Sequence, residues 1–257
     1  MSGRAFIRIL LCAALAAPAT GAQAADDVLA ANLAAVREAL DPRAASAIAR
    51  IEGTGRQLLA ARSYLRAGGG IAERWSWSDA EIAAWRDSPA QSALDAAIAR
   101  VRAAFESANP GYTLHVNPEV RSFEVQLERW NSNPSITAAS AALAEAASIA
   151  IQSQGFPAPG TPLAQAAFGD FLRAFVPSPT PPLAAPGLSA HGQMRAVDFV
   201  VKQGDRIVAG ASTADIPAIW TGQGWAARLN AAVLASGAPF AGPLRIPDEP
   251  WHYDYRP

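Results

Sequence analysis

Apolar residues recur at helical spacing through the first third of the chain. Leucine and valine repeat every three to four residues between positions 29 and 40, which places them on one face of a helix. Asp41-Pro42 is typical of a helix start, because the Asp side chain can accept from free backbone N–H groups and Pro suits the first turn. This second helix is expected to run to about residue 52. A third is expected over residues 57–66, ended by Gly68-Gly69-Gly70.

The middle of the chain continues the helical pattern with one interruption. Ser78-Asp79-Ala80-Glu81 is a capping-box sequence and predicts a short helix to about residue 86. Three tryptophans, Trp75, Trp77 and Trp85, are interpreted as an aromatic core patch, with a stacking surface for sugars or peptides as the alternative. Further helices are expected over residues 91–107, 118–130, 137–151 and 162–175, and a strand over residues 112–116.

The pattern changes after residues 177–186, a proline-rich segment without periodicity that is expected to be a stiff connector. Two runs of β-forming residues, 196–201 and 206–211, are joined by Gln203-Gly204-Asp205 and predict a hairpin. A helix over residues 224–235 and a strand over residues 251–255 follow. Helices followed by antiparallel strands predict an α+β fold, with a small antiparallel sheet flanked by helices and a helical extension before it.

The first 24 residues have the features of an export signal. Arg4 and Arg8 precede a short apolar run, and Ala22-Gln23-Ala24 provides the small residues that signal peptidase recognises. The apolar run is too short to span a bilayer as a stable helix, although an uncleaved anchor is the alternative. Cleavage after Ala24 would make the protein periplasmic or secreted. No later segment is a continuous apolar run of transmembrane length, so no integral membrane segment is expected after cleavage.

Charge and cysteine content narrow the classes of partner. The chain has 21 basic and 22 acidic residues, and loss of Arg4 and Arg8 with the signal leaves 19 and 22, a net charge near −3. Nucleic-acid binding requires a basic surface, so a nucleic-acid partner is not expected. The single cysteine, Cys12, lies within the signal. Any metal site of the exported protein must therefore use His, Asp and Glu.

Two of the three histidines have carboxylates close by in sequence. His191 precedes Asp198 by seven residues, and Glu249 precedes His252 by three. Two His and one Asp would supply the three protein ligands of a catalytic zinc, and Glu249 could then serve as general base for a water molecule. An odd offset along a strand puts side chains on opposite faces, so a bend near Pro250 is needed to bring Glu249 and His252 together. Spacing alone leaves open that both histidines are structural.

Three short motifs surround these residues. Ser189-Ala190-His191, followed by Ala196-Val197-Asp198, has the form Ser-x-His-x-x-x-x-Ala-x-Asp. Glu249-Pro250-Trp251-His252 has the form Glu-x-Trp-His, and the segment from Arg121 to Gln126 has the form Arg-Ser-x-x-x-Gln. All three resemble motifs of the D-Ala-D-Ala carboxypeptidase and dipeptidase family of zinc peptidases (VanY-like and VanX-like enzymes). They occur in that family's order and cover roughly residues 90–257.

The resemblance implies a zinc peptidase that cuts the stem peptides of bacterial cell wall, in the first place a D-alanyl-D-alanine carboxypeptidase. It implies that His191, Asp198 and His252 hold Zn²⁺. It also implies that Glu249 is the general base and that Arg121 stabilises the oxyanion. The partner would be a peptidoglycan peptide.

The resemblance further implies contacts with the substrate, and this chain departs from the family pattern in one stretch. Ser189 and Gln126 would contact polar ends of the substrate. The family usually has Gly where this chain has Met194, followed by a small or apolar residue where this chain has Arg195. Longer side chains there could narrow the cleft and change substrate choice.

The expected organisation is a signal peptide over residues 1–24, a helical region over 25–90 and a zinc peptidase domain over 91–257 with the carboxypeptidase-like fold. Phage L-Ala-D-Glu endopeptidases share that fold, so the cleaved bond is left open. A non-catalytic cell-wall binding protein that retains the fold is the alternative function. His115, the third histidine, is interpreted as structural.

Overall fold

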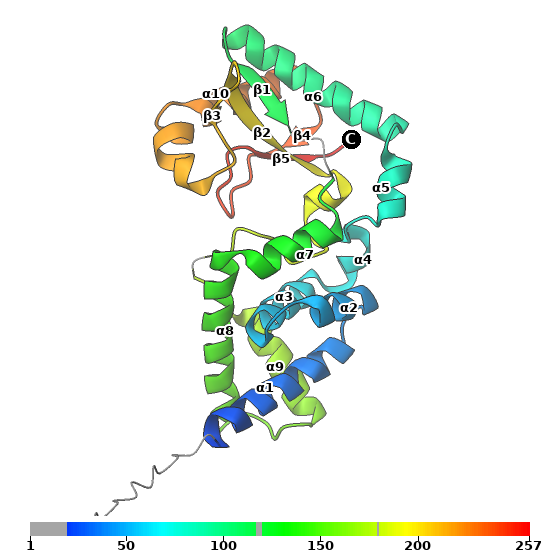
Figure 1. Ribbon diagram of the computed structural model, residues 1–257, viewed down its shortest axis with the longest axis vertical. Coiled ribbons are helices and arrows are strands. Elements are labelled where there is room, and N and C mark those ends of the chain that lie inside the picture. Colours follow the sequence, from blue (N-terminus) through cyan, green and yellow to red (C-terminus); the bar gives the residue numbers. More distant parts are fainter. Residues whose placement is uncertain (1–19, 117–119, 179) are drawn as a thin grey trace, which may run out of the picture.

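Figure 1 shows a computed structural model of the chain, which describes residues 20–116, 120–178 and 180–257. Most of the expected signal peptide, residues 1–19, lies outside these ranges, so the signal stays a prediction. In Figure 1 the molecule has two halves, a sheet with its covering helices and a group of packed helices, with α7 lying between them.

Helices make up most of the described chain. They are α1 (Thr20–Glu38), α2 (Pro42–Arg50), α3 (Thr54–Ala67), η1 (Gly68–Gly70), α4 (Ile71–Arg74), α5 (Asp79–Trp85), α6 (Pro89–Ala108), α7 (Phe123–Ser132), α8 (Pro134–Gln152), α9 (Pro162–Ala174), η2 (Ala190–Gln193), η3 (Thr213–Asp215), η4 (Ile216–Thr221) and α10 (Trp225–Ser236). The strands are β1 (Thr113–Val116), β2 (Ala196–Gln203), β3 (Arg206–Ala209), β4 (Phe240–Ala241) and β5 (His252–Tyr255).

Side-chain caps fix the helix starts where the sequence placed them. The Asp41 carboxylate accepts from the backbone N–H of Arg43 at 2.8 Å, with Pro42 at the first position of α2. Ser78 and Glu81 form the predicted capping box of α5. Each cap satisfies N–H groups that have no partner inside the helix.

The start of α7 differs from the prediction. A helix was expected from residue 118, but residues 117–119 lie outside the described ranges and α7 begins at Phe123. Ser122 caps it by accepting from the N–H of Val125. The N–H of Arg121 donates instead to the carbonyl of His191 at 3.3 Å, which keeps this residue out of the helix.

One small antiparallel sheet confirms the α+β class. The strand order is β1-β2-β5-β4, and β3 also pairs with β2. The predicted hairpin is present: β2 and β3 meet at the pair Gln203 and Arg206, with Gly204 at φ +57° in the turn. Strand β2 pairs with β1, β3 and β5, so it is the central strand of the sheet.

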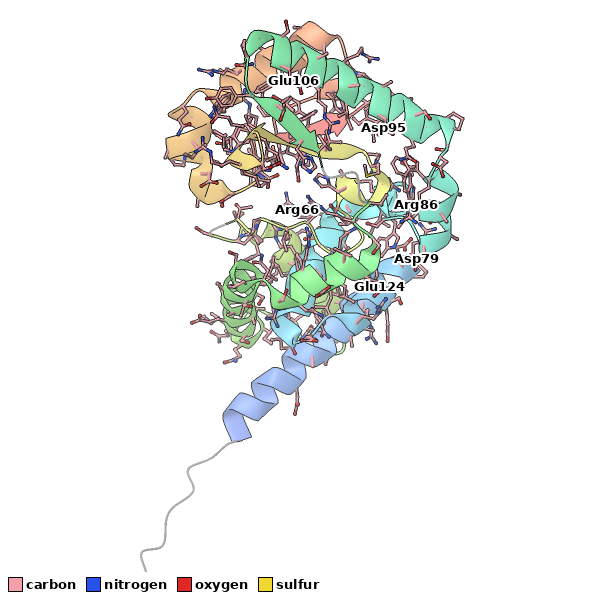
Figure 2. All side chains as sticks on the ribbon, turned by 45° about the horizontal axis from the view of Figure 1, so that its top comes forward. Arg66, Asp79, Arg86, Asp95, Glu106 and Glu124 are labelled. Carbon is pink, nitrogen blue, oxygen red and sulfur yellow. The ribbon has the colours of Figure 1, made fainter. Side chains whose placement is uncertain are left out.

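A sheet core holds one half of the molecule together. Helices α6 and α10 pack against each other and cover the sheet (Figure 1). Figure 2 labels Asp95 and Glu106, which mark the course of α6 over this half. Buried Phe105, Phe199 and Tyr253 come from α6, β2 and β5. This packing fixes the strands that carry the candidate site.

A separate helical core holds the other half. Helices α1, α2 and α3 pack with α8 and α9, and buried Leu58, Leu143 and Phe168 come from α3, α8 and α9. The helical core therefore draws on residues from both sides of position 90. The boundary placed at that position stays a prediction.

The three tryptophans divide between the two cores instead of forming one patch. Trp75 lies 5.9 Å from the rings of both Tyr64 and Phe123, beside the helical core. Trp77 and Trp85 lie 5.7 Å apart and pack beside the sheet core. All three are partly buried, so packing is their observed role.

Within the described ranges, α8 is the one helix long and apolar enough to cross a membrane by length and composition, with a mean hydropathy of 1.3. Its residues Ile136, Leu143 and Ala147 are buried in the helical core. Core helices of soluble proteins often meet the same criterion. The absence of an integral membrane segment after signal cleavage stays a prediction.

Candidate metal centre

Strand register brings two of the expected ligands together. Asp198 of β2 and His252 of β5 are direct partners across the antiparallel pair. Side chains at such positions start from Cβ atoms about 4.5–5.5 Å apart. His191 comes from η2, the turn just before β2, which is closed by the N–H of Arg195 donating to the carbonyl of Ala190 at 2.9 Å. A short turn and one strand pair thus place all three side chains at one point.

The three ligand atoms have the separations that a metal ion requires. Nε2 of His191 lies 3.3 Å from Nδ1 of His252 and 3.4 Å from Oδ1 of Asp198. Nδ1 of His252 lies 3.0 Å from the same oxygen. Ligands about 2.0–2.1 Å from a tetrahedral ion are about 3.3 Å apart, so the observed triangle fits. Both histidines are 9% exposed. This buried cluster could hold a metal ion.

Burial and hydrogen bonding shift the pKa values of the three cluster residues in different directions. Burial lowers the pKa of His191. Burial also acts to lower the pKa of His252. The hydrogen bond to Asp198 and the charges of the nearby carboxylates act in the opposite direction and outweigh burial, so the pKa of His252 is raised. Burial also opposes ionisation of Asp198, yet hydrogen bonds from both histidines hold the pKa of that carboxyl far below its usual range. A metal ion at this point would bind the deprotonated forms of all three side chains.

A turn at Pro250 brings Glu249 beside the cluster, as the sequence required. The N–H of His252 donates to the carbonyl of Glu249 at 3.0 Å, which closes the turn. Oε2 of Glu249 then lies 3.7 Å from Nδ1 of His252. Burial raises the pKa of Glu249, and the charge on Asp198 acts in the same direction while His252 opposes it. Glu249 is therefore a stronger base than an exposed glutamate.

Arg121 is tied to the cluster by its side chain and its backbone. Nη2 donates to Oδ2 of Asp198 at 2.7 Å, and the N–H donates to the carbonyl of His191. Asp198 thus offers one oxygen to the histidines and the other to the guanidinium. The Arg121 side chain is 31% exposed, so part of its charge faces the adjoining cavity.

Gln126 is held by the protein at both ends of its amide. Nε2 donates to Oγ of Ser76 and to the carbonyl of Arg121, both at 2.6 Å. Oε1 accepts from the N–H of Gly187 at 3.0 Å. Both amide hydrogens are therefore occupied, and in this arrangement Gln126 positions Arg121. Its expected contact with substrate stays a prediction.

All seven residues expected at the site line a single cavity of about 700 Å³. They are Arg121, Gln126, Ser189, His191, Asp198, Glu249 and His252. The Ser189 hydroxyl makes no hydrogen bond to any residue in the described ranges, so it is available to a ligand. A volume of this size suits a short peptide.

Met194 does not narrow this cavity. Its side chain is 5% exposed and packs in the sheet core, and neither it nor the exposed Arg195 lines the cavity. Met194 has φ 51°, the left-handed conformation that Gly adopts without strain. The chain therefore keeps the backbone shape that Gly would give at this position and directs the longer side chain away from the site.

Asp254 lines the cavity and Ser76 holds Gln126 from behind it, and neither residue was predicted. Oδ1 of Asp254 lies 3.6 Å from Nε2 of His252, on the side of the ring away from the cluster. The alternation of side chains along a strand could have indicated it, because residues two apart share a face. Ser76 lies far from every motif, and no sequence signal connects it with Gln126.

Comparison with protein-family models, with curated proteins and with solved structures gives no significant match. The resemblance to the carboxypeptidase family therefore rests on the three motifs alone and stays a prediction.

Replacing Gly192 with Ala should damage the site by overpacking. An added Cβ would collide with the side chain of Ser76 and lie 2.8 Å from Nε2 of Gln126. Overpacking of this kind costs about 1–3 kcal/mol. We expect the melting temperature to fall by several degrees and metal affinity to weaken, because the displaced residue follows His191. Calorimetry and metal titration would measure both effects.

Gly69→Ala is the matched control. A Cβ at Gly69 has no neighbour within 4 Å, and its φ is not positive. We expect that variant to melt within about a degree of the parent chain, since surface changes of this kind are nearly neutral. Equal melting temperatures and metal affinities for the two variants would show that the contact between Gly192 and Ser76 is unimportant.

Proposed function

We propose that this chain is an exported, zinc-dependent peptidase with a D-Ala-D-Ala carboxypeptidase-like fold. Its substrates are D-amino-acid-containing stem peptides of peptidoglycan, and D-alanyl-D-alanine carboxypeptidase is the activity that the motifs favour. The observation that supports it is the convergence of His191, Asp198 and His252 on one point, with Glu249 beside it, at the wall of a peptide-sized cavity.

The ligand set favours zinc over calcium and magnesium. Two imidazole nitrogens and one carboxylate oxygen are typical of catalytic zinc sites, whereas calcium and magnesium prefer all-oxygen sets. When bound, zinc would supply Lewis-acid polarisation of a water molecule or of a carbonyl oxygen. Asp254 beside the far nitrogen of His252 would orient that ring, as carboxylates next to zinc-binding histidines commonly do.

The remaining residues have separate tasks in this proposal. Glu249 accepts a proton from the attacking water and returns it to the leaving amine, a role that its raised pKa suits. Arg121 is held beside Asp198 and stabilises negative charge that develops on the carbonyl oxygen. The free hydroxyl of Ser189 contacts a polar group of the substrate.

Digestion of defined peptides tests the activity. The zinc-loaded protein is incubated with purified muropeptides and with synthetic peptides ending in D-Ala-D-Ala or L-Ala-L-Ala, and the products are read by mass spectrometry. We expect release of one alanine from the D,D peptide alone, and none after chelation. Binding to peptidoglycan without any product from the zinc-loaded protein would contradict the proposal and favour a non-catalytic cell-wall binding protein.

A further inference from the structure

One face of α7 forms a wall of the cavity next to the candidate metal centre. Gln126, Arg129 and Asn133 are spaced by three and four residues, which puts them on the same side of the helix. All three line the cavity. The wall begins at Arg121, which contacts Asp198, and runs away from the cluster toward the junction of α7 and α8.

Arg129 is an unpaired cation on this wall. Its side chain makes no ion pair or hydrogen bond with residues 20–116, 120–178 or 180–257, and the residue is exposed. Glu124 of α7 (labelled in Figure 2) pairs with Arg50 at 2.9 Å and does not line the cavity, and Glu128 does not line it either. No carboxylate of α7 therefore shares the cavity with Arg129.

Asn133 adds further donors beside this cation. Its Oδ1 accepts from the N–H groups of Ser135 and Ile136 and so caps α8. Its amide nitrogen has no partner in the described ranges, and the positive end of the α8 dipole lies behind it. The carboxylates that do line the cavity, Asp198, Glu249 and Asp254, all gather around His252.

We propose that Arg129 and Asn133 form a subsite for a carboxylate of the substrate, an inference that rests on the peptidase function proposed above. Arg129 lies about 9 Å along α7 from Phe123, at 1.5 Å per residue. An extended peptide covers that length in about three residues. About three extended residues of a peptide would therefore fit along α7 between its start and Arg129.

A substrate could supply this carboxylate from its C-terminus or from an acidic residue within the chain. Both would form the same charge-assisted hydrogen bonds with a guanidinium. Three synthetic peptides distinguish them: a parent peptide with both carboxylates, one amidated at the C-terminus and one amidated at the internal acid.

Binding of these peptides to zinc-loaded protein by titration calorimetry tests the subsite. The Glu249→Gln background is used because it should slow cleavage enough for the measurement. We expect Arg129→Gln to weaken binding of the parent peptide about tenfold, which corresponds to about 1.4 kcal/mol. Arg129→Lys keeps the charge but loses the planar guanidinium fork, so its affinity should lie between those of the parent chain and of Arg129→Gln. The matched control is Arg100→Gln, since Arg100 is an exposed arginine of α6 that does not line the cavity.

The two amidated peptides identify the source of the carboxylate. The amidated peptide that lacks the carboxylate bound by Arg129 should have the same affinity for Arg129→Gln as for the Arg100→Gln control. Equal affinity of Arg129→Gln and Arg100→Gln for the parent peptide would overturn the subsite, as would an Arg129 effect that persists in full with both amidated peptides.

Failure of the subsite and failure of the peptidase are separable. Normal digestion of D,D peptides by an Arg129→Gln protein with unchanged KM would refute the subsite alone. Arg129-dependent binding without any digestion by the parent protein would refute the peptidase and retain the carboxylate site.

Discussion

Glu249→Gln is expected to bind zinc as tightly as the parent chain and to hydrolyse D,D peptides about a thousandfold more slowly. Gln has the same size as Glu but cannot accept a proton from water, and general base catalysis contributes about 10²- to 10⁴-fold. The burial that raises the pKa of Glu249 makes this carboxylate a stronger base than an exposed glutamate. Steady-state kinetics and metal analysis of the same preparation would measure both properties.

Asp248→Asn is the matched control for this change. Asp248 is the neighbouring residue, exposed and outside the cavity, so removal of its charge should leave kcat within about twofold of the parent value. A Glu249→Gln protein as active as this control would exclude Glu249 as the base. Loss of zinc from it would instead show that Glu249 is a ligand.

Replacement of any one of the three ligands should abolish stable zinc binding. Changes to groups that only orient a ligand already cost about 10–100-fold in metal affinity, so His191→Ala should cost more than about a hundredfold. Zinc at a hundred times its dissociation constant stabilises the folded chain by about 2.7 kcal/mol. For a chain of this size that is a rise of several degrees in melting temperature, which the variant should lack.

His115→Ala is the control for the ligand variants. His115 is the remaining histidine, exposed on β1 and outside the cluster. Its replacement should leave the zinc content at one per chain and preserve the zinc-dependent rise in melting temperature. A His191→Ala protein that still melts higher with zinc would show that the ion binds elsewhere.

Local signals in the sequence were sufficient to predict most elements. Caps at Asp41 and Ser78 and the turn at Gly204 act within four residues, so the pattern contains the cause of each structure. The start of α7 was misplaced because its local cap, Ser122, was not recognised and because the N–H of Arg121 bonds to the distant carbonyl of His191. The division of the tryptophans between two cores has the same origin, since it depends on which helices pack together.

The chemistry of the site could be predicted better than its geometry. The motifs named the histidines and carboxylates, and the bend at Pro250 followed from the need to bring Glu249 and His252 together. The pairing of Asp198 with His252 across β2 and β5 depends on strand register, which the sequence alone does not specify here. Likewise, Ser76 and Arg129 reach the site only through the packing of α7, and no local pattern indicates this.

An anomalous difference map at the zinc absorption edge, from crystals of the zinc-loaded chain, tests the central claim most directly. We predict one peak, about 2.0–2.2 Å from Nε2 of His191, Nδ1 of His252 and Oδ1 of Asp198, with the Glu249 carboxylate beside the open position. A zinc peak at another place, or none between these three side chains, would contradict the account.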